Sequence, residues 1–177
     1  MKRQLIWMAC SGTAALVMVA GCSNSHAEPS PDRAVSPAAS VGQTEAPQSS
    51  KAAFAGHVKT ALENRLNPNE ARFGTGTGSP CSTSSAKMFT AECGSAAEAT
   101  GADASFALEQ IKHHDGFATL RSVAKKLQTA VARYRQLGCA NNPTEASTRH
   151  ACLEPAALIA QGFQDIRDGA NLGLGGQ

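Results

Sequence analysis

The sequence predicts an all-α fold: a small, disulfide-clipped helical bundle of three to four helices that follows a disordered linker. Apolar residues recur at spacings of three and four in several long segments, which is the period of one face of an α-helix. No segment shows the alternation of apolar and polar residues that is typical of a half-buried strand. Four cysteines follow residue 50, an even number that allows two disulfides.

The first predicted helix runs from Lys51 to Leu66. Ser49 or Ser50 can cap its start, because a serine hydroxyl accepts a hydrogen bond from a free amide of the first turn. Pro68 is expected to stop it, since the residue before a proline is pushed out of helical geometry. One stripe of this helix holds its apolar residues, which are Phe54, Val58, Ala61, Leu62 and Leu66.

Two short segments come next. Residues 74–80 are rich in glycine and are expected to form a surface loop rather than a phosphate site, because no buried strand precedes them. Between Cys81 and Cys93 the pattern favours a short helix over an irregular loop. Ser95 and Glu98 match a capping box, which predicts a helix start there.

The longest periodic segment runs from about Ala104 to Leu137 and predicts one central helix, which Gly116 is expected to kink. Gly138, just past the last apolar residue, is expected to end it. The apolar positions of this segment are Phe117, Leu120, Ala124, Leu127, Val131 and Tyr134.

The C-terminal segment predicts a short helical turn and a final helix. Thr144 can cap the turn, which leads towards Cys152, and Pro155 suits the first turn of the final helix. Residues 173–177 are expected to fray. The apolar face of the final helix comprises Ala156, Ile159, Ala160, Phe163, Ile166 and Ala170.

The four cysteines predict a specific pairing among the three that are possible. Cys139 ends one helix and Cys152 stands just before the next, so a disulfide can clip that helix–helix turn. Cys81 and Cys93 then pair by elimination. A zinc site is disfavoured because the spacing contains no C-x2-C pair.

The N-terminus has the three regions of an export signal. Lys2 and Arg3 precede an uncharged run over residues 5–20, and Val19-Ala20-Gly21-Cys22 follows the pattern of an aliphatic residue, two small residues and a cysteine. In residues 1–22 the chain resembles the bacterial lipoproteins. That resemblance implies cleavage before Cys22 and diacylation of its thiol. An ordinary secretory signal or a membrane span is the alternative, but the apolar run is shorter than the roughly 18 residues of a span.

These features predict the organisation and location of the chain. Residues 1–21 are the expected signal peptide, residues 22–50 a lipidated cysteine with a Pro/Ser/Ala-rich tether, and residues 51–177 the helical domain. The expected location is the cell membrane, with the domain held by the lipid on its extracytoplasmic side. The mature chain has 14 basic and 14 acidic side chains once Lys2 and Arg3 are removed, so nucleic acid is not an expected partner. No cofactor is expected.

One charge pattern suggests a function. The segment between Gly116 and Thr144 contains five cations and no acid, and on a helical wheel the cations mostly oppose the apolar stripe. This face is expected either to bind an acidic protein or an anionic envelope polymer, or to serve only as a solvated surface. The protein is thus interpreted as a non-catalytic binding module. The five cations are Arg121, Lys125, Lys126, Arg133 and Arg135.

The alternative is a small envelope enzyme or a metal-binding protein. His57, His113, His114 or His150 would supply its ligands or its acid and base, provided that the fold brings several of them together. His113 and His114 are adjacent and cannot chelate one ion from a helix, so a Glu109–His113 pair is the simpler expectation. Asp165 and Asp168 are expected to be solvated surface acids rather than a catalytic pair.

Overall fold

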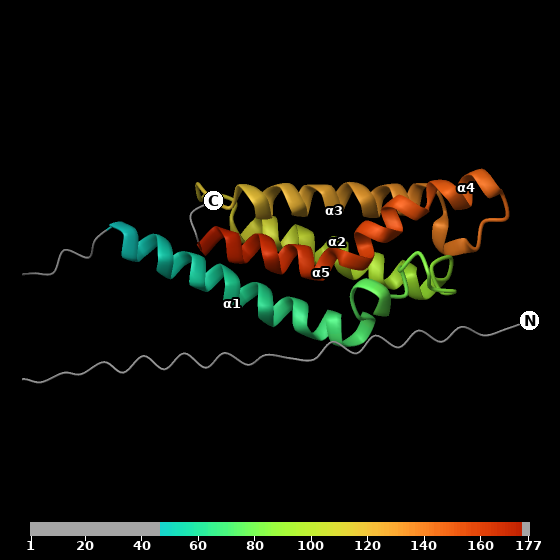
Figure 1. Cartoon of the computed structure of the whole chain (residues 1–177). Helices are drawn as coiled ribbons and strands as arrows, with labels where there is room; N and C mark the ends of the chain where they lie inside the picture. Colours follow the sequence, from blue (N-terminus) through green and yellow to red (C-terminus); the bar gives the residue numbers. More distant parts are fainter. Residues whose placement is uncertain (1–46, 175–177) are drawn as a thin grey trace, which may run out of the picture. The chain divides into compact units, whose positions relative to one another are not determined.

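A computed structural model of the chain describes residues 47–174, and it is all-α over that range. It contains four long helices, one short helix and two 3-10 turns, with no strand among the described residues (Figure 1). The predicted fold class is therefore confirmed. The signal peptide, Cys22 and nearly all of the predicted tether lie outside the described residues. None of the described helices is both long and apolar enough to cross a membrane.

Helix α1 (Pro47–Phe73) continues through Pro68, so the prediction that it stops there is wrong. A proline inside a helix removes one internal hydrogen bond and disturbs the preceding turn. Contacts with another helix compensate, because Glu63 before the proline and Glu70 after it both bind Arg167. Tertiary ion pairs on both sides therefore hold the helix together across Pro68.

The start of α1 also differs from the prediction. The helix already includes Pro47 to Ser50, so Ser49 and Ser50 lie within it rather than before its first turn. Three of its predicted stripe residues are fully buried, namely Val58, Leu62 and Leu66. The predicted apolar stripe is thus correct even though both ends of the helix are misplaced.

Residues 74–90 form consecutive turns, so the short helix favoured after Cys81 is wrong. A 3-10 turn, η1 (Gly76–Gly78), begins the segment, and the Thr75 hydroxyl donates to the carbonyl of Ala160, 3.2 Å away. Amides then donate to carbonyls three residues earlier at Ser82, Ser85 and Met88. The glycine-rich stretch is therefore packed against the last helix rather than extending freely into solvent.

Helix α2 (Ala91–Gln110) begins earlier than the capping-box pattern predicts. The Thr90 hydroxyl accepts a hydrogen bond from the amide of Glu92, 3.3 Å away, and caps the helix. Ser95 and Glu98 consequently lie one turn inside it, where they are exposed. The predicted start at Ser95 is wrong because a competing cap occurs five residues before it.

The predicted central helix over residues 104–137 is wrong, because the chain reverses direction between α2 and α3 (Ala118–Gln136). Gly116 and Phe117 adopt left-handed conformations with φ of 91° and 54°. Such a conformation is costly for phenylalanine. Its side chain is only 4% exposed in the core, and that burial offsets the strain.

Helices α2 and α3 are antiparallel. Gln128 donates to the Ser105 hydroxyl over 3.0 Å, and Arg135 lies 3.8 Å from the carboxylate of Glu98. The later residue of α3 therefore contacts the earlier residue of α2, as antiparallel packing requires. The apolar stripe predicted for one long helix is still buried, now against both α2 and α5.

The C-terminal third follows the prediction closely. Gly138, with φ of 65°, ends α3 and leads into η2 (Cys139–Asn141). A short helix, α4 (Ala146–Ala151), then precedes α5 (Leu153–Leu174). Glu145 rather than Thr144 is the N-cap residue of α4, and Pro155 lies in the first turn of α5 as predicted. All six apolar residues predicted to line α5 are buried.

Two disulfides are present, and they are the predicted pairs. Cys81–Cys93 joins the turn segment to α2, and Cys139–Cys152 joins η2 to the chain just before α5. All four cysteines are fully buried. The disulfides therefore fasten the irregular segments of the domain to its long helices.

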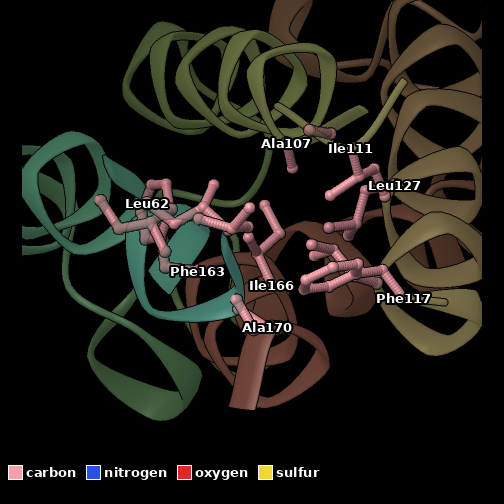
Figure 2. Close-up of a cluster of buried hydrophobic side chains, with 14 residues drawn as sticks. Leu62, Ala107, Ile111, Phe117, Leu127, Phe163, Ile166 and Ala170 are labelled. Atoms are coloured by element: carbon pink, nitrogen blue, oxygen red, sulfur yellow. The ribbon is translucent and has the colours of Figure 1, made fainter. Parts of the chain in front are cut away.

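The core has two parts. One lies where α1, α2, α3 and α5 meet, and Figure 2 shows Leu62, Ile111, Leu127 and Ile166 converging there. The other surrounds the disulfides and includes Tyr134, whose hydroxyl donates to the carbonyl of Met88. Burial raises the pKa of Tyr134 to about 12.

Helix α5 approaches its neighbours closely because glycines replace side chains at the contacts. A Cβ at Gly169 would lie 2.9 Å from Leu120 Cα, and one at Gly162 would lie 2.4 Å from Thr100 Cγ2. Both distances are shorter than van der Waals contact. The close approach fixes α5 against α2 and α3, and so sets the surface that α3 and α5 share.

Candidate functional site

The exposed side of α3 carries the predicted cations, but the structure gives them different roles. Arg121 is half-buried and donates to the carbonyls of Ile111, His114 and Gly116 at 3.1, 3.2 and 3.1 Å. It therefore holds the α2–α3 turn together. Arg121 is thus not a free cation of the predicted face, because its hydrogen bonds stabilise a chain reversal that the sequence pattern did not reveal.

Arg135 also has a partner inside the domain. Its guanidinium lies 3.8 Å from Glu98, with both side chains more than half exposed. An ion pair in such an exposed position contributes little to stability, about 0–1 kcal/mol. Arg135 is thus partly neutralised but remains on the surface.

The other three cations, Lys125, Lys126 and Arg133, form what we call the cationic strip. All three are exposed, and none makes an ion pair with a described residue. Positions 126 and 133 are seven residues apart, which puts them on the same side of a helix, about 10 Å apart along its axis. The strip therefore places Lys126 and Arg133 on one side of α3, with Lys125 about 100° around the helix from Lys126.

The cationic strip borders a shallow recess between α3 and α5. The recess has a volume of about 260 Å³, and Lys126 and Arg133 line it on the α3 side. Ala130, Pro155 and Leu158 give it apolar walls, and Glu154 contributes a carboxylate from α5. We call this feature the α3–α5 recess.

One acid of α5, Asp165, lies near the strip, and a second, Asp168, lies near Asp165. Burial raises the pKa of Asp165, and its neighbour Asp168 raises it further, whereas Lys126 lowers it. Lys126 is thus close enough to Asp165 to influence its charge without forming an ion pair with it. Asp165 is half-buried beside a lysine, so the expectation that it is a solvated surface acid is wrong, whereas Asp168 is exposed as expected.

A second, more polar cleft of about 600 Å³ lies beside the glycine-rich turns. Two of its charged residues already pair with each other, because Lys87 Nζ lies 2.7 Å from Glu92 Oε2. A third, Arg72, stacks over the ring of Phe73 at 4.8 Å. The cations of this cleft are thus engaged within the domain, unlike those of the cationic strip.

The histidines considered for the alternative function are dispersed. His57 is exposed on α1, and His150 is on α4, at the opposite end of the bundle from the α2–α3 turn (Figure 1). His113 and His114 lie in that turn, where the ring of His114 stacks on Phe54 with centroids 3.5 Å apart. Over the described residues, no three histidine, cysteine or acidic side chains are placed to hold a metal ion.

The expected Glu109–His113 pair does not form. Residue 113 follows the end of α2, so the two residues are not on one helical face. Glu109 instead lies 3.7 Å from the ammonium group of Lys112. The expectation is wrong for the same reason as the single central helix: the chain turns before His113.

The sequence pattern missed a buried polar cluster around Asp103. This side chain is fully buried in α2, and it accepts hydrogen bonds of 2.7 Å from Arg65 and from Asn69 of α1. Burial raises the pKa of Asp103, and the hydrogen bonds from Asn69 and Arg65 offset part of that rise. The partners are more than 30 residues away in the sequence, so no local spacing indicates the cluster.

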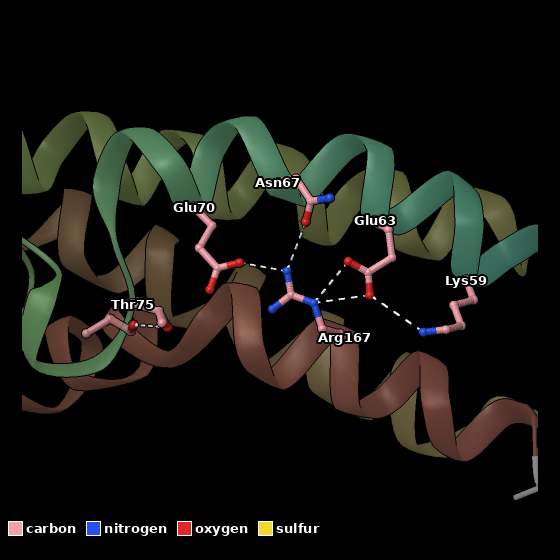
Figure 3. Close-up of polar contacts among 7 residues, drawn as sticks. Lys59, Glu63, Asn67, Glu70, Thr75 and Arg167 are labelled. Atoms are coloured by element: carbon pink, nitrogen blue, oxygen red, sulfur yellow. Dashed lines mark hydrogen bonds and ion pairs between the residues drawn. The ribbon is translucent and has the colours of Figure 1, made fainter.

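A second cluster, on Arg167 of α5, was also missed (Figure 3). Arg167 donates to Glu63 at 3.1 and 3.2 Å, to Glu70 at 2.7 Å and to Asn67 at 3.3 Å. The hydrogen bond to Glu70 is the main cause that raises the pKa of Arg167, and burial opposes it. Lys59 lies 3.8 Å from Glu63 and extends the cluster. Both clusters join helices that are far apart in the sequence.

Comparison with protein-family models, with curated proteins and with solved structures gives no match for this chain. The surface chemistry of the described domain and the N-terminal sequence are therefore the basis for a proposed function.

Proposed function

We propose that this protein is a lipid-anchored envelope protein whose helical domain is a non-catalytic binding module for an anionic partner. One observation carries the proposal. Lys125, Lys126 and Arg133 are exposed on α3 and have no ion-pair partner among the described residues. Other cations of the domain, such as Arg65 and Arg167, pair with its own carboxylates.

Uncompensated charge on one face favours an external partner of opposite sign. Because the basic and acidic residues of the processed chain balance, its long-range field is weak, and the local surface decides what it attracts. Positive and negative patches that match each other steer encounter and fix orientation. An acidic protein segment or an anionic envelope polymer has the required charge.

Charge reversal on the strip tests this function. The Lys125→Glu/Lys126→Glu/Arg133→Glu variant is expected to bind isolated envelope at least tenfold more weakly than the wild type. Wild-type binding should also weaken as salt rises from 0.1 M to 1 M, because the Debye length falls from about 10 Å to about 3 Å. The triple variant should keep its helical circular dichroism, since exposed surface substitutions change stability by about 0.5 kcal/mol or less. Arg121 is left unchanged because it holds the α2–α3 turn.

A matched variant controls for total charge. Lys51, Lys87 and Lys112 are exposed cations on other surfaces of the domain, and replacing all three with glutamate changes the net charge equally. This control should retain most of the binding. An equal loss in both triple variants would show that the overall charge, rather than the cationic strip, is responsible.

The lipid anchor is tested separately. The lipobox supports attachment at Cys22, so Cys22→Ala is expected to leave the precursor uncleaved at this site or to release a soluble form. Cys10→Ala is the matched control, because this cysteine lies within the expected leader and precedes the cleavage site. Fractionation and metabolic labelling with a fatty acid give the readout. If Cys22→Ala fractionates and labels like the wild type, the anchor assignment is wrong.

A further inference from the structure

We infer that the α3–α5 recess takes one apolar side chain of an acidic protein segment, whose carboxylates pair with Lys126 and Arg133. This inference rests on the proposed function and specifies the partner. The recess combines two kinds of surface that a single ligand must match. Its walls are apolar at Ala130, Pro155 and Leu158, and its α3 side is positively charged.

The size of the recess favours one side chain over a whole small molecule. Sites for drug-sized ligands and cofactors have volumes of about 300–1,000 Å³. The α3–α5 recess has about 260 Å³ and is open to solvent. It is therefore suited to an anchoring residue on a larger partner, whose remaining surface lies outside the recess.

The spacing of the cations matches an extended peptide. Lys126 and Arg133 are separated by about 10 Å along α3. An extended peptide of the polyproline II type rises about 3.1 Å per residue with three residues per turn, so acidic residues three positions apart lie on one face, about 9 Å apart. An apolar residue between them would lie over the recess. The expected segment thus has two acidic residues three positions apart, with an apolar residue between them, in extended conformation along α3.

The apolar walls distinguish a peptide from an anionic polymer. A polymer of repeating charges can neutralise the strip, but it leaves the exposed part of Leu158 in contact with water. A peptide that buries an apolar side chain there gains additional affinity from the area it removes from water. Glu154, which contributes a carboxylate on the α5 side, repels acids on that side and so restricts them to the α3 side.

Two labelled peptides serve as probes for the purified processed chain in detergent. Both consist of aspartate and glutamate, and they differ only at the central residue, which is phenylalanine in one and serine in the other. Fluorescence anisotropy should show the phenylalanine peptide binding about tenfold more tightly. Leu158→Ser should reduce that preference to about twofold or less while leaving the affinity for the serine peptide unchanged.

A second variant keeps the inference testable if Leu158→Ser does not fold. Glu154 is exposed, and Glu154→Gln removes the repulsive carboxylate. It should tighten binding of both peptides by about twofold to threefold at low salt, because like-charge repulsion is lost. Unchanged or weaker binding in a folded Glu154→Gln variant would place the peptide elsewhere.

The outcomes separate this inference from the proposed function. Equal, salt-sensitive affinity for the two peptides would overturn the apolar anchor and leave an electrostatic binding module. Binding to envelope polymer but to neither peptide would also overturn the apolar anchor and leave an electrostatic binding module. If neither the peptides nor isolated envelope bound, both the inference and the proposed function would fail.

Discussion

Asp103 shows how a single side chain links stability to pH in this domain. It is fully buried, and the net effect of its surroundings raises its pKa above 3.8. The folded state therefore retains the proton to higher pH than the unfolded state does. By linkage, the free energy of unfolding falls as pH rises from about 3.8 through the raised pKa, and this contribution is constant above it.

We predict that Asp103→Asn removes this pH dependence, because asparagine does not titrate. In urea denaturation, the stability of Asp103→Asn relative to the wild type should improve between pH 4 and pH 7. Asp103→Ala, in contrast, leaves Asn69 and Arg65 without their acceptor and should cost about 1–3 kcal/mol at pH 7. A relative stability of Asp103→Asn that declined over the same pH range would contradict the assigned direction of the shift.

At the scale of elements, the α2–α3 turn decides the topology of the bundle. Gly116 has φ of 91°, a conformation that L-residues rarely adopt, although the space around it is open. We predict that Gly116→Ala destabilises the domain by about 1–2 kcal/mol through backbone strain alone. Thermal or chemical denaturation measures the change.

Gly56 provides the matched control for that substitution. It lies inside α1, and an added Cβ would again meet nothing within 4 Å. Because alanine is a better helix former than glycine, Gly56→Ala should stabilise the domain by about 0.5–1 kcal/mol. Effects of the same sign at both positions would show that backbone conformation is not the cause.

At the scale of the whole molecule, the two parts of the core differ in that only one of them contains disulfides. All four cysteines belong to the part of the core that includes Met88, Tyr134 and Ile159. The other part contains Leu62, Leu66 and Ile166, and no cysteine. Loss of a disulfide should therefore affect one end of the bundle more than the other.

We predict that the Cys139→Ala/Cys152→Ala variant loses about 3 kcal/mol of stability, since its cross-link closes a loop of 13 residues. Hydrogen exchange should accelerate most in η2, α4 and the first turns of α5. Amides around Leu62 and Leu66 in α1 should keep more of their protection. Uniform loss of protection in both parts of the core would show that the domain opens only as one unit.

The amino-acid sequence alone determined which apolar faces of α1, α3 and α5 are buried. The stripes on the α1, α3 and α5 segments follow the 3.6-residue period. Which residues share a face of a helix depends on this period and not on where the helix begins or ends. Leu62, Leu127 and Phe163 are buried as expected. The cysteine pairing was also predictable, because Cys139 and Cys152 flank a short turn that glycine and proline mark. These signals are local in the chain.

Only the tertiary structure decided where α1 ends, where the chain turns between α2 and α3, and which charges are free. Pro68 is tolerated because Arg167, about a hundred residues later, binds carboxylates on both sides of it. Phe117 adopts a left-handed conformation because its ring is buried in the core. Arg121 is removed from the cationic surface by carbonyls that exist only in the turned chain. In each case a contact between distant segments outweighs the local preference of the backbone, and a pattern of neighbouring residues carries no information about it.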